Sequence, residues 1–308
     1  MNAGILEAIK KSAAVPSMPQ VVTRFLEVIR DPHFEYDDIV KILSTDAGMV
    51  SEVLRLANSA LFGVSRKITN LKQAVTLLGP KRTRSMVLGR YLVGSLGEKI
   101  GGGIDTNYFW RRSLASAVLG ARIADSVLPK QRDEVFISAL LADVGVTILA
   151  QAIPERYESI STCYAPYGRF FTDDEEREAV DVTHAEVSAM VLAYWGLPEL
   201  ICKAVNLHHC AGIGTEDDAT RIARILNGAD HIAKLLCEIP DMGDAGKICS
   251  DAADFIGVDL AVISRLLSEI ENDVEELAAI LHIDVIPSTV YDMIAKSVQE
   301  RLTVSSAD

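Results

Sequence analysis

Histidine side chains lie on largely apolar helix faces in the second half of the chain. His184 follows Thr183, and Glu186 completes the pattern of a capping box, so we expect Thr183 to cap a helix that begins at His184. His184 shares one face of that helix with mostly apolar residues, and His208 shares the apolar face of the next helix. The sequence therefore predicts that both imidazoles point toward the core.

Two aspartates also lie on or beside apolar helix faces. Asp143 interrupts an otherwise apolar helical stripe, and Asp230 lies at the edge of another. An unpaired carboxylate in an apolar core is costly, so Asp143 must have a partner. Helical bundles hold metal ions with histidines and carboxylates on facing helices. We therefore predict one polar cluster inside a bundle, formed by Asp143, His184, His208, His209 and Asp230.

Each of these residues also has a purely structural interpretation. A single histidine on an inward face is more often a core residue with satisfied hydrogen bonds than a ligand, and the neighbours His208 and His209 can arise by chance. Only the coincidence of several such residues supports a site.

Length, charge and composition limit the class of protein. A chain of 308 residues favours two domains, and 49% hydrophobic residues supply an ample core. The net charge of −13 argues against a nucleic-acid partner, because most of the surface would repel phosphates. Five cysteines without a CxxC pair are typical of reduced thiols, and no signal peptide or uninterrupted run of eighteen apolar residues is seen. We expect a cytoplasmic protein that does not bind a membrane.

Helical periodicity runs through the whole chain, without alternation of period two. We therefore predict an all-α protein with a helical bundle at residues 1–100 and a larger one, including further C-terminal helices, at residues 104–308. The boundary is placed at the triplet 101–103, because three consecutive glycines do not favour a helix. In the second half, residues 132–150 and 260–281 are each predicted to form one continuous helix.

Two charged clusters are predicted to have no functional role. Lys81, Arg82 and Arg84 gather at a helix start, and we interpret them as solvated side chains on an exposed face, with an anion-binding surface as the alternative. The acidic run at residues 173–176 suits the first turn of a helix, which explains it without a site.

Several longer stretches form a recognisable set of motifs. They are LSTDAGM at 43–49, LRLANSALFG at 54–63, ITNLKQAVTLLG at 68–79, FWRRSLA at 109–115, ALLADVG at 139–145, HAEV at 184–187, WGLP at 195–198 and the histidine pair at 208–209. The combination resembles the HDOD domain, the HD-related output domain of bacterial signalling proteins, over roughly residues 14 to 240. This resemblance implies an N-terminal bundle of about five helices packed on a larger HD-domain-like bundle, with a groove between them.

The wider HD superfamily hydrolyses phosphate esters with metals, which are held by an upstream histidine, a His-Asp doublet and a later aspartate. The resemblance places Arg112 at the upstream histidine and Ala142 at the histidine of the doublet. Alanine offers no ligand, and arginine does not lose its proton to donate a lone pair. We therefore predict that catalysis is lost, and that the Arg112 guanidinium lies near Asp143 as its charge partner.

Other ligand positions are retained. Asp143 matches the aspartate of the doublet, Asp230 matches the last aspartate, and the three histidines 184, 208 and 209 match additional histidines of the phosphodiesterase branch. Three or four ligands still hold one ion, whereas hydrolysis with two metals needs both ions. On this interpretation the protein requires no cofactor. If these residues bind anything, we expect it to be one residual divalent metal ion.

The predicted function is a non-catalytic signalling or regulatory module that binds a protein partner or a small ligand. This step rests on analogy of fold. Two alternatives stay open: a metal-dependent phosphohydrolase or phosphodiesterase with an altered metal site, and a nucleotide or anion receptor that uses Arg112 as its anchor.

Overall fold

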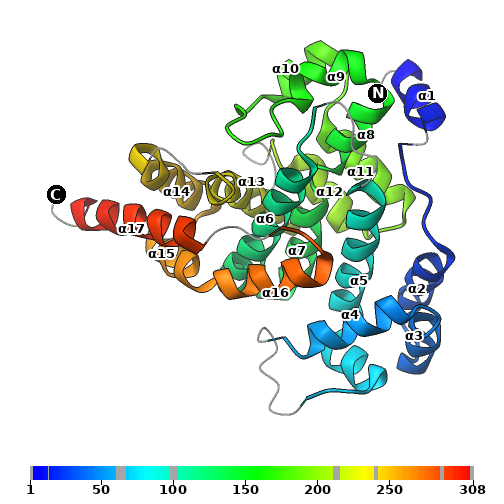
Figure 1. The fold of residues 1–308 in the computed structure, drawn as a ribbon. Helices are drawn as coiled ribbons and strands as arrows, with labels where there is room; N and C mark the ends of the chain where they lie inside the picture. Colours follow the sequence, from blue (N-terminus) through cyan, green and yellow to red (C-terminus); the bar gives the residue numbers. More distant parts are fainter. Residues whose placement is uncertain are drawn as a thin grey trace.

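Helices are the regular secondary structure of the described part of the protein. The computed structural model describes residues 3–12, 14–59, 67–97, 103–210, 216–238, 242–284 and 288–305. Within these ranges every regular element is a helix and no strand occurs (Figure 1). The predicted all-α fold class is confirmed. Gly101 and Gly102, on which the predicted domain boundary partly rests, lie outside the described residues.

The N-terminal bundle contains four of the helices, the last of which is sharply kinked. Gly79 has a φ of 73° and Pro80 follows it, so α5 consists of two helical arms that meet at this kink. The second arm leaves the bundle and packs on the larger one. The helices are α2 (Gln20–Arg30), α3 (Tyr36–Leu43), α4 (Ala47–Ala57) and α5 (Leu71–Gly97).

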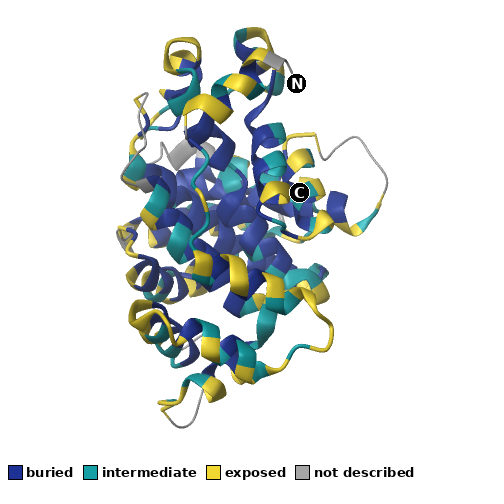
Figure 2. Cartoon of the chain, turned by 90° about the vertical axis from the view of Figure 1, so that its right-hand side faces the viewer, coloured by how far each residue is buried: buried dark blue, intermediate teal, exposed yellow. Residues whose placement is uncertain are grey.

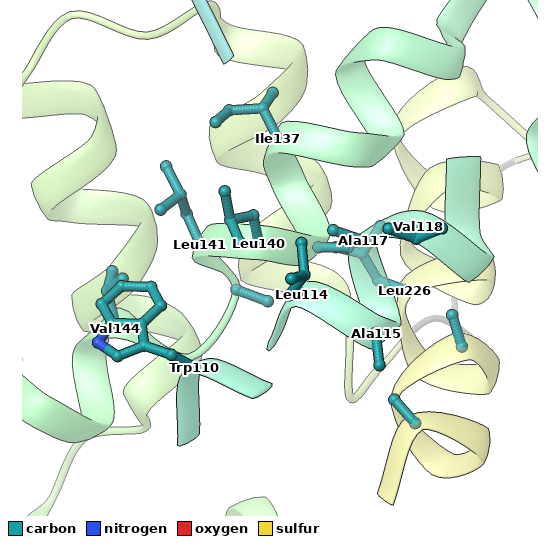
Figure 3. Packing of buried hydrophobic residues seen from close by; sticks show 14 of the residues in the cluster. Trp110, Leu114, Ala115, Ala117, Val118, Ile137, Leu140, Leu141, Val144 and Leu226 are labelled. Atoms are coloured by element: carbon teal, nitrogen blue, oxygen red, sulfur yellow. The ribbon is translucent and has the colours of Figure 1, made fainter. Parts of the chain in front are cut away.

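The larger bundle surrounds one long helix, which is buried on nearly all sides. This helix, α6, packs against α7 and α13, and Figure 3 shows Leu114 and Val118 of α6 among Leu140 and Leu226 from those two helices. Figure 2 shows the same distribution, with buried residues in the centre and exposed ones at the rim. The helices are α6 (Thr106–Val127), α7 (Arg132–Leu141), α8 (Val144–Ala152), α9 (Pro154–Ser161), α10 (Asp173–Val180), α11 (His184–Tyr194), α12 (Glu199–Leu207) and α13 (Asp218–Leu236).

A short N-terminal helix, α1 (Ala3–Ser12), was not predicted from the sequence. It packs on α8 of the larger bundle and lies apart from α2 to α4 (Figure 1). The segment that follows it runs back to the N-terminal bundle and is held from both sides. Trp195 Nε1 donates to the carbonyl of Pro16 at 3.3 Å, and Tyr91 Oη donates to that of Ser17 at 2.6 Å. The two bundles are therefore tied together by this segment.

The C-terminal helices continue the packing beyond the larger bundle. The helix predicted over 260–281 is in fact two helices that meet at the buried Ile270. The second of them contacts α4, α5 and α6, and Arg55 Nη1 donates to the carbonyl of Ala279 at 3.0 Å. It therefore bridges the two bundles. The helices are α14 (Met242–Ile256), α15 (Leu260–Glu269), α16 (Glu271–Leu281) and α17 (Ser288–Ser305).

The cations at the start of the second arm of α5 are not an independent solvated face. Lys81 pairs with Glu134 at 2.8 Å, and Arg82 pairs with Asp133 at 2.9 Å. Arg84 is buried. The prediction failed because the acidic first turn of α7 lies opposite these cations, a long-range contact that local charge patterning does not reveal. The ion pairs help to join α5 to α7.

The helix predicted over 132–150 is also broken. α7 ends at Leu141, α8 begins at Val144, and Asp143 lies in the turn between them with φ −101° and ψ 8°. Among the described residues, Pro129–Ala152 is the one stretch with the length and hydropathy of a membrane span, and 83% of its most apolar window is buried inside the fold. The turn divides this apolar stretch into two core helices and sets Asp143 apart from both.

The turn is held against α11 by a close backbone approach. A Cβ atom on Gly145 would lie 2.1 Å from the carbonyl oxygen of His184 and 2.9 Å from the nitrogen of Ser188. Gly145 N donates to Ser188 Oγ at 2.8 Å in the same place. Only glycine permits this approach, which brings the Asp143 turn next to the start of α11.

We expect Gly145→Ala to lower the free energy of unfolding by ~3 kcal/mol, the upper end for overpacking, because the added methyl group would meet backbone atoms that cannot move aside. Urea unfolding measures this. Gly94→Ala is the matched control. Among the described residues, its Cβ would lie close only to the flexible end of Arg90, and alanine is favoured in a helix by roughly 0.5–1 kcal/mol. Equal effects of the two substitutions would contradict the close approach.

Candidate metal centre

Four side chains from three parts of the larger bundle form one cluster. Asp143 comes from the turn before α8, His184 is the first residue of α11, and His208 and His209 follow the end of α12. One possible ligand atom from each side chain lies within 4.8 Å of all the others. His184 and His208 are almost fully buried. The structure therefore brings together four of the five ligands that the sequence suggested.

A capping box at the start of α11 fixes the position of His184. The predicted capping box is present: Thr183 Oγ1 accepts from the Glu186 nitrogen at 3.2 Å, and Glu186 Oε2 accepts from the Thr183 nitrogen at 3.1 Å. This arrangement fixes the first turn of the helix, and His184 with it. The inward orientation of His184 is confirmed.

The spacing of the cluster fits one tetrahedral metal ion. His184 Nε2 lies 3.0 Å from His209 Nε2 and 3.3 Å from Asp143 Oδ1, and His208 Nε2 lies 3.4 Å from the same oxygen. With metal–ligand bonds of about 2.0–2.1 Å, the ligand atoms of a tetrahedral site are about 3.4 Å apart. These four side chains would therefore hold a single ion with little rearrangement.

The orientation of His208 provides a second test of the fit. Its Nδ1 donates to the carbonyl of Val205 at 2.6 Å, which is a fixed acceptor. In the neutral imidazole the lone pair is therefore on Nε2. This atom faces Asp143, is buried and has no hydrogen-bond partner among the described residues. A donor nitrogen fixed by a backbone carbonyl is typical of metal-binding histidines.

A carboxylate that the sequence analysis missed supports the other side of the cluster. Glu176 is fully buried, and its Oε2 accepts from His184 Nδ1 at 2.8 Å. Tyr157 Oη donates to the other oxygen of Glu176. The acidic run at 173–176 therefore does not consist of helix-start residues alone. The signal in the sequence is weak: Glu176 precedes the buried Val180 by four residues, so both lie on one face of α10.

The side chains of this cluster shift one another's pKa values. Burial by itself would raise the pKa of Asp143, but contacts with His184 and His208 and their charges hold this pKa well below its usual range. Burial by itself would lower the pKa of His184, but the charge of Glu176 and the contacts with Asp143 and Glu176 raise it to about 10. Burial and the neighbouring imidazoles lower the pKa of His209. Without a metal, the cluster therefore favours a proton on His184.

Arg112 and Asp230 form a separate ion pair beside this cluster. Arg112 Nε donates to Asp230 Oδ1 at 2.7 Å, and its Nη2 donates to Oδ2 at 2.5 Å. Asp143 instead has the histidines as its partners. The prediction that Arg112 neutralises Asp143 is therefore wrong, because the two carboxylates face different groups across the bundle. Asp230, predicted as a fifth ligand, does not join the cluster, because both of its oxygens accept hydrogen bonds from Arg112.

Aromatic rings cover both the ion pair and the cluster. The Arg112 guanidinium lies 5.4 Å from the ring centre of Tyr164 and 5.6 Å from that of Phe170. Phe170 stacks on His231, with ring centres 4.5 Å apart, and Phe171 packs edge-on against His184 at 5.6 Å. The rings of Tyr164, Phe170 and Phe171 come from the irregular segment between α9 and α10. They limit access of water to the charged groups.

The raised pKa of His184 predicts a pH dependence of stability in metal-free protein. Because the folded pKa of about 10 exceeds the 6.5 of an unperturbed histidine, the proton stabilises the fold fully below pH 6.5. This stabilisation is lost as the pH rises from 6.5 towards 10. With a chelator present, urea unfolding across this range should show a smaller decline in His184→Gln than in the wild type. The exposed His33, changed to Gln, is the control, and an unchanged decline in His184→Gln would contradict the assignment.

Comparison with known proteins agrees with this architecture. Residues 15–211 match the HDOD domain family. An uncharacterized protein of Treponema pallidum (strain Nichols) is 26% identical over 207 residues, which are 63% of this chain. The chain spans only 38% of the length of that relative.

Two solved structures share the fold. A candidate phosphohydrolase from Shewanella amazonensis SB2B matches with a TM-score of 0.70 and 21% identity, over 91% of this chain and 98% of that one. An HDOD domain protein with unknown function from Geobacter sulfurreducens matches with a TM-score of 0.67 and 23% identity, over 90% and 96%. At these identities the likeness concerns the fold alone. Because the family match covers well over half of the sequence, the chain belongs to the HDOD domain family.

Proposed function

We propose that this protein is a non-catalytic regulatory module that keeps one metal position and acts by binding a signalling protein. The observation that carries the proposal is the two-point ion pair between Arg112 and Asp230. The resemblance to the HD superfamily implies that both positions belong to metal ligands in its hydrolases. Here a permanent cation occupies the first of them and engages the carboxylate of the second.

This replacement argues against a pair of metal ions. Both oxygens of Asp230 already accept hydrogen bonds from Arg112, and the guanidinium would repel a cation placed beside it. Ala142 offers no ligand at the doublet position. Hydrolysis with two metals depends on ions that clamp both the attacking and the leaving oxygen of the phosphate. The present side chains favour one ion at most.

The remaining cluster also has the character of a closed site. Catalytic zinc sites use three protein ligands and leave a fourth position for water or substrate, whereas structural sites use four. Asp143, His184, His208 and His209 supply four ligand atoms. A bound divalent ion would act as a Lewis acid, but these four ligands leave no position for a substrate in a tetrahedral sphere.

The two alternative functions have less support. An altered phosphohydrolase is favoured by the retained Asp–His cluster, but not by the occupied Asp230. A receptor for a nucleotide or another anion would need Arg112 as its anchor, yet this side chain is 6% exposed and uses its Nε and Nη2 on Asp230. Binding an anion there would first require breaking a buried ion pair.

A turnover assay tests the loss of catalysis. Purified chain supplied with Zn²⁺, Mn²⁺ or Fe²⁺ should not hydrolyse phosphodiesters, nucleotides or cyclic dinucleotides above the rate of buffer with the same metal. Metal-dependent turnover that disappears in His184→Ala and persists in the control His33→Ala would overturn the proposal.

Protein binding needs a separate experiment. The chain immobilised as bait should retain a specific protein from a bacterial lysate, and the purified pair should form a complex of defined stoichiometry. Binding of the purified partner should survive in salt at several times the physiological concentration if apolar surface contributes. Failure of every retained protein to bind in purified form would count against a partner.

A further inference from the structure

Glu176 is a buried carboxylate without a cationic side chain of lysine or arginine as its partner among the ion pairs of the described residues. Its ion-pair partner is His184, at 2.8 Å, and its second oxygen accepts from Tyr157. All three side chains are essentially inaccessible to solvent. A buried carboxylate is strongly destabilising unless a positive charge lies close to it. The position of Glu176 therefore calls for positive charge on or beyond the His184 ring.

The charge count of the cluster points to a divalent ion. Among the described residues, two carboxylates form ion pairs with the histidines of the cluster, those of Asp143 and Glu176. With neutral imidazoles they carry two negative charges. One divalent cation between Asp143 and the three histidines balances both charges, because Glu176 acts on the ion through the His184 ring.

Glu176 also decides which nitrogen of His184 can bind. A carboxylate accepts hydrogen bonds, so in the neutral, metal-binding form of His184 the proton is on Nδ1 and the lone pair is on Nε2. This Nε2 lies 3.0 Å from His209 Nε2 and 3.3 Å from Asp143 Oδ1. The hydrogen bond from Nδ1 also makes the imidazole a better electron donor. Glu176 thus aims the donor atom at the centre of the cluster.

Tyr157 in turn holds Glu176. Its hydroxyl group donates to Oε1 and leaves Oε2 for His184. The three residues come from the consecutive helices α9, α10 and α11. The starts of α10 and α11 are fixed by capping boxes at Thr172 and Thr183. The chain of contacts is therefore built from rigid elements.

We infer that Glu176, held by Tyr157, is the positioning residue of a one-ion site formed by Asp143, His184, His208 and His209. The inference rests on the single metal position of the proposed function. Three imidazole nitrogens and one carboxylate oxygen suit Zn²⁺ or Co²⁺, whereas Mg²⁺ and Ca²⁺ prefer oxygen ligands. The site therefore selects a divalent transition ion.

Metal binding to the full chain, stripped with a chelator and supplied with Co²⁺ or Zn²⁺ alone, tests the inference. The visible absorption of Co²⁺ should show tetrahedral coordination and saturate at one equivalent, and Zn²⁺ should displace it. Loss of a residue that orients a ligand typically weakens binding by about 10–100-fold. We expect that loss in Glu176→Gln, still at one equivalent, and a smaller loss in Tyr157→Phe. The exposed Glu178 on the same helix, changed to Gln, is the control and should bind as the wild type does.

Three results would overturn the inference: an unchanged affinity in folded Glu176→Gln, an equal loss in Glu178→Gln, or saturation at two equivalents. If Glu176→Gln does not fold, an unchanged affinity in Tyr157→Phe is the contradicting result. The proposed function fails separately. Wild-type protein that binds no metal refutes both the positioning role and the retained metal position, and leaves the absence of turnover intact. Turnover with one bound ion refutes the non-catalytic proposal and leaves the positioning role intact.

Discussion

Charge buried between helices must be balanced where it lies, and this requirement organises the centre of the molecule. Arg112 on α6 and Asp230 on α13 satisfy it with two parallel hydrogen bonds. Removing one partner of a buried pair typically destabilises a protein by about 3–5 kcal/mol, because the other charge is left unpaired. Each residue therefore makes the other necessary, and together they fix how α6 and α13 lie against each other.

The neighbouring cluster meets the same requirement in a different way. Asp143 faces imidazoles, and an imidazole can give up its proton and bind an ion, which a guanidinium does not. The ion pair is thus permanent, whereas the charge beside Asp143 is exchangeable. The interior is thus divided into one part that is closed by arginine and another in which four side chains have the spacing of a single-ion site.

Backbone geometry makes this arrangement possible. The turn after Ala142 takes Asp143 out of the helical stripe, and Gly145 lets that turn touch the start of α11. The capping box at Thr183 then places His184 opposite the carboxylate. Small displacements here would separate the ligand atoms, since their spacing is close to that of a single coordination sphere.

The sequence by itself determined the helical class of the protein and the buried face of α11, but not every helix boundary. The capping box located the start of α11, and the inward orientation of His184 followed from helical period, because both depend on residues within one or two turns. The resemblance added the fold, and with it the expectation that the positions of Arg112 and Ala142 no longer bind metal.

Only the tertiary structure decided which charged side chains pair with each other. Helical period states which way a side chain points, but not which group lies opposite it, and Arg112 and Asp230 are separated by 118 residues. The same limit hid Glu176, whose acidic neighbours suit an exposed first turn equally well until α9 and α11 enclose it. The break at Asp143 was missed because α7 and α8 both continue an apolar pattern, and packing against α11 favours the turn between them. Local sequence encodes direction and propensity, whereas charge pairing depends on contacts that form only when distant helices meet.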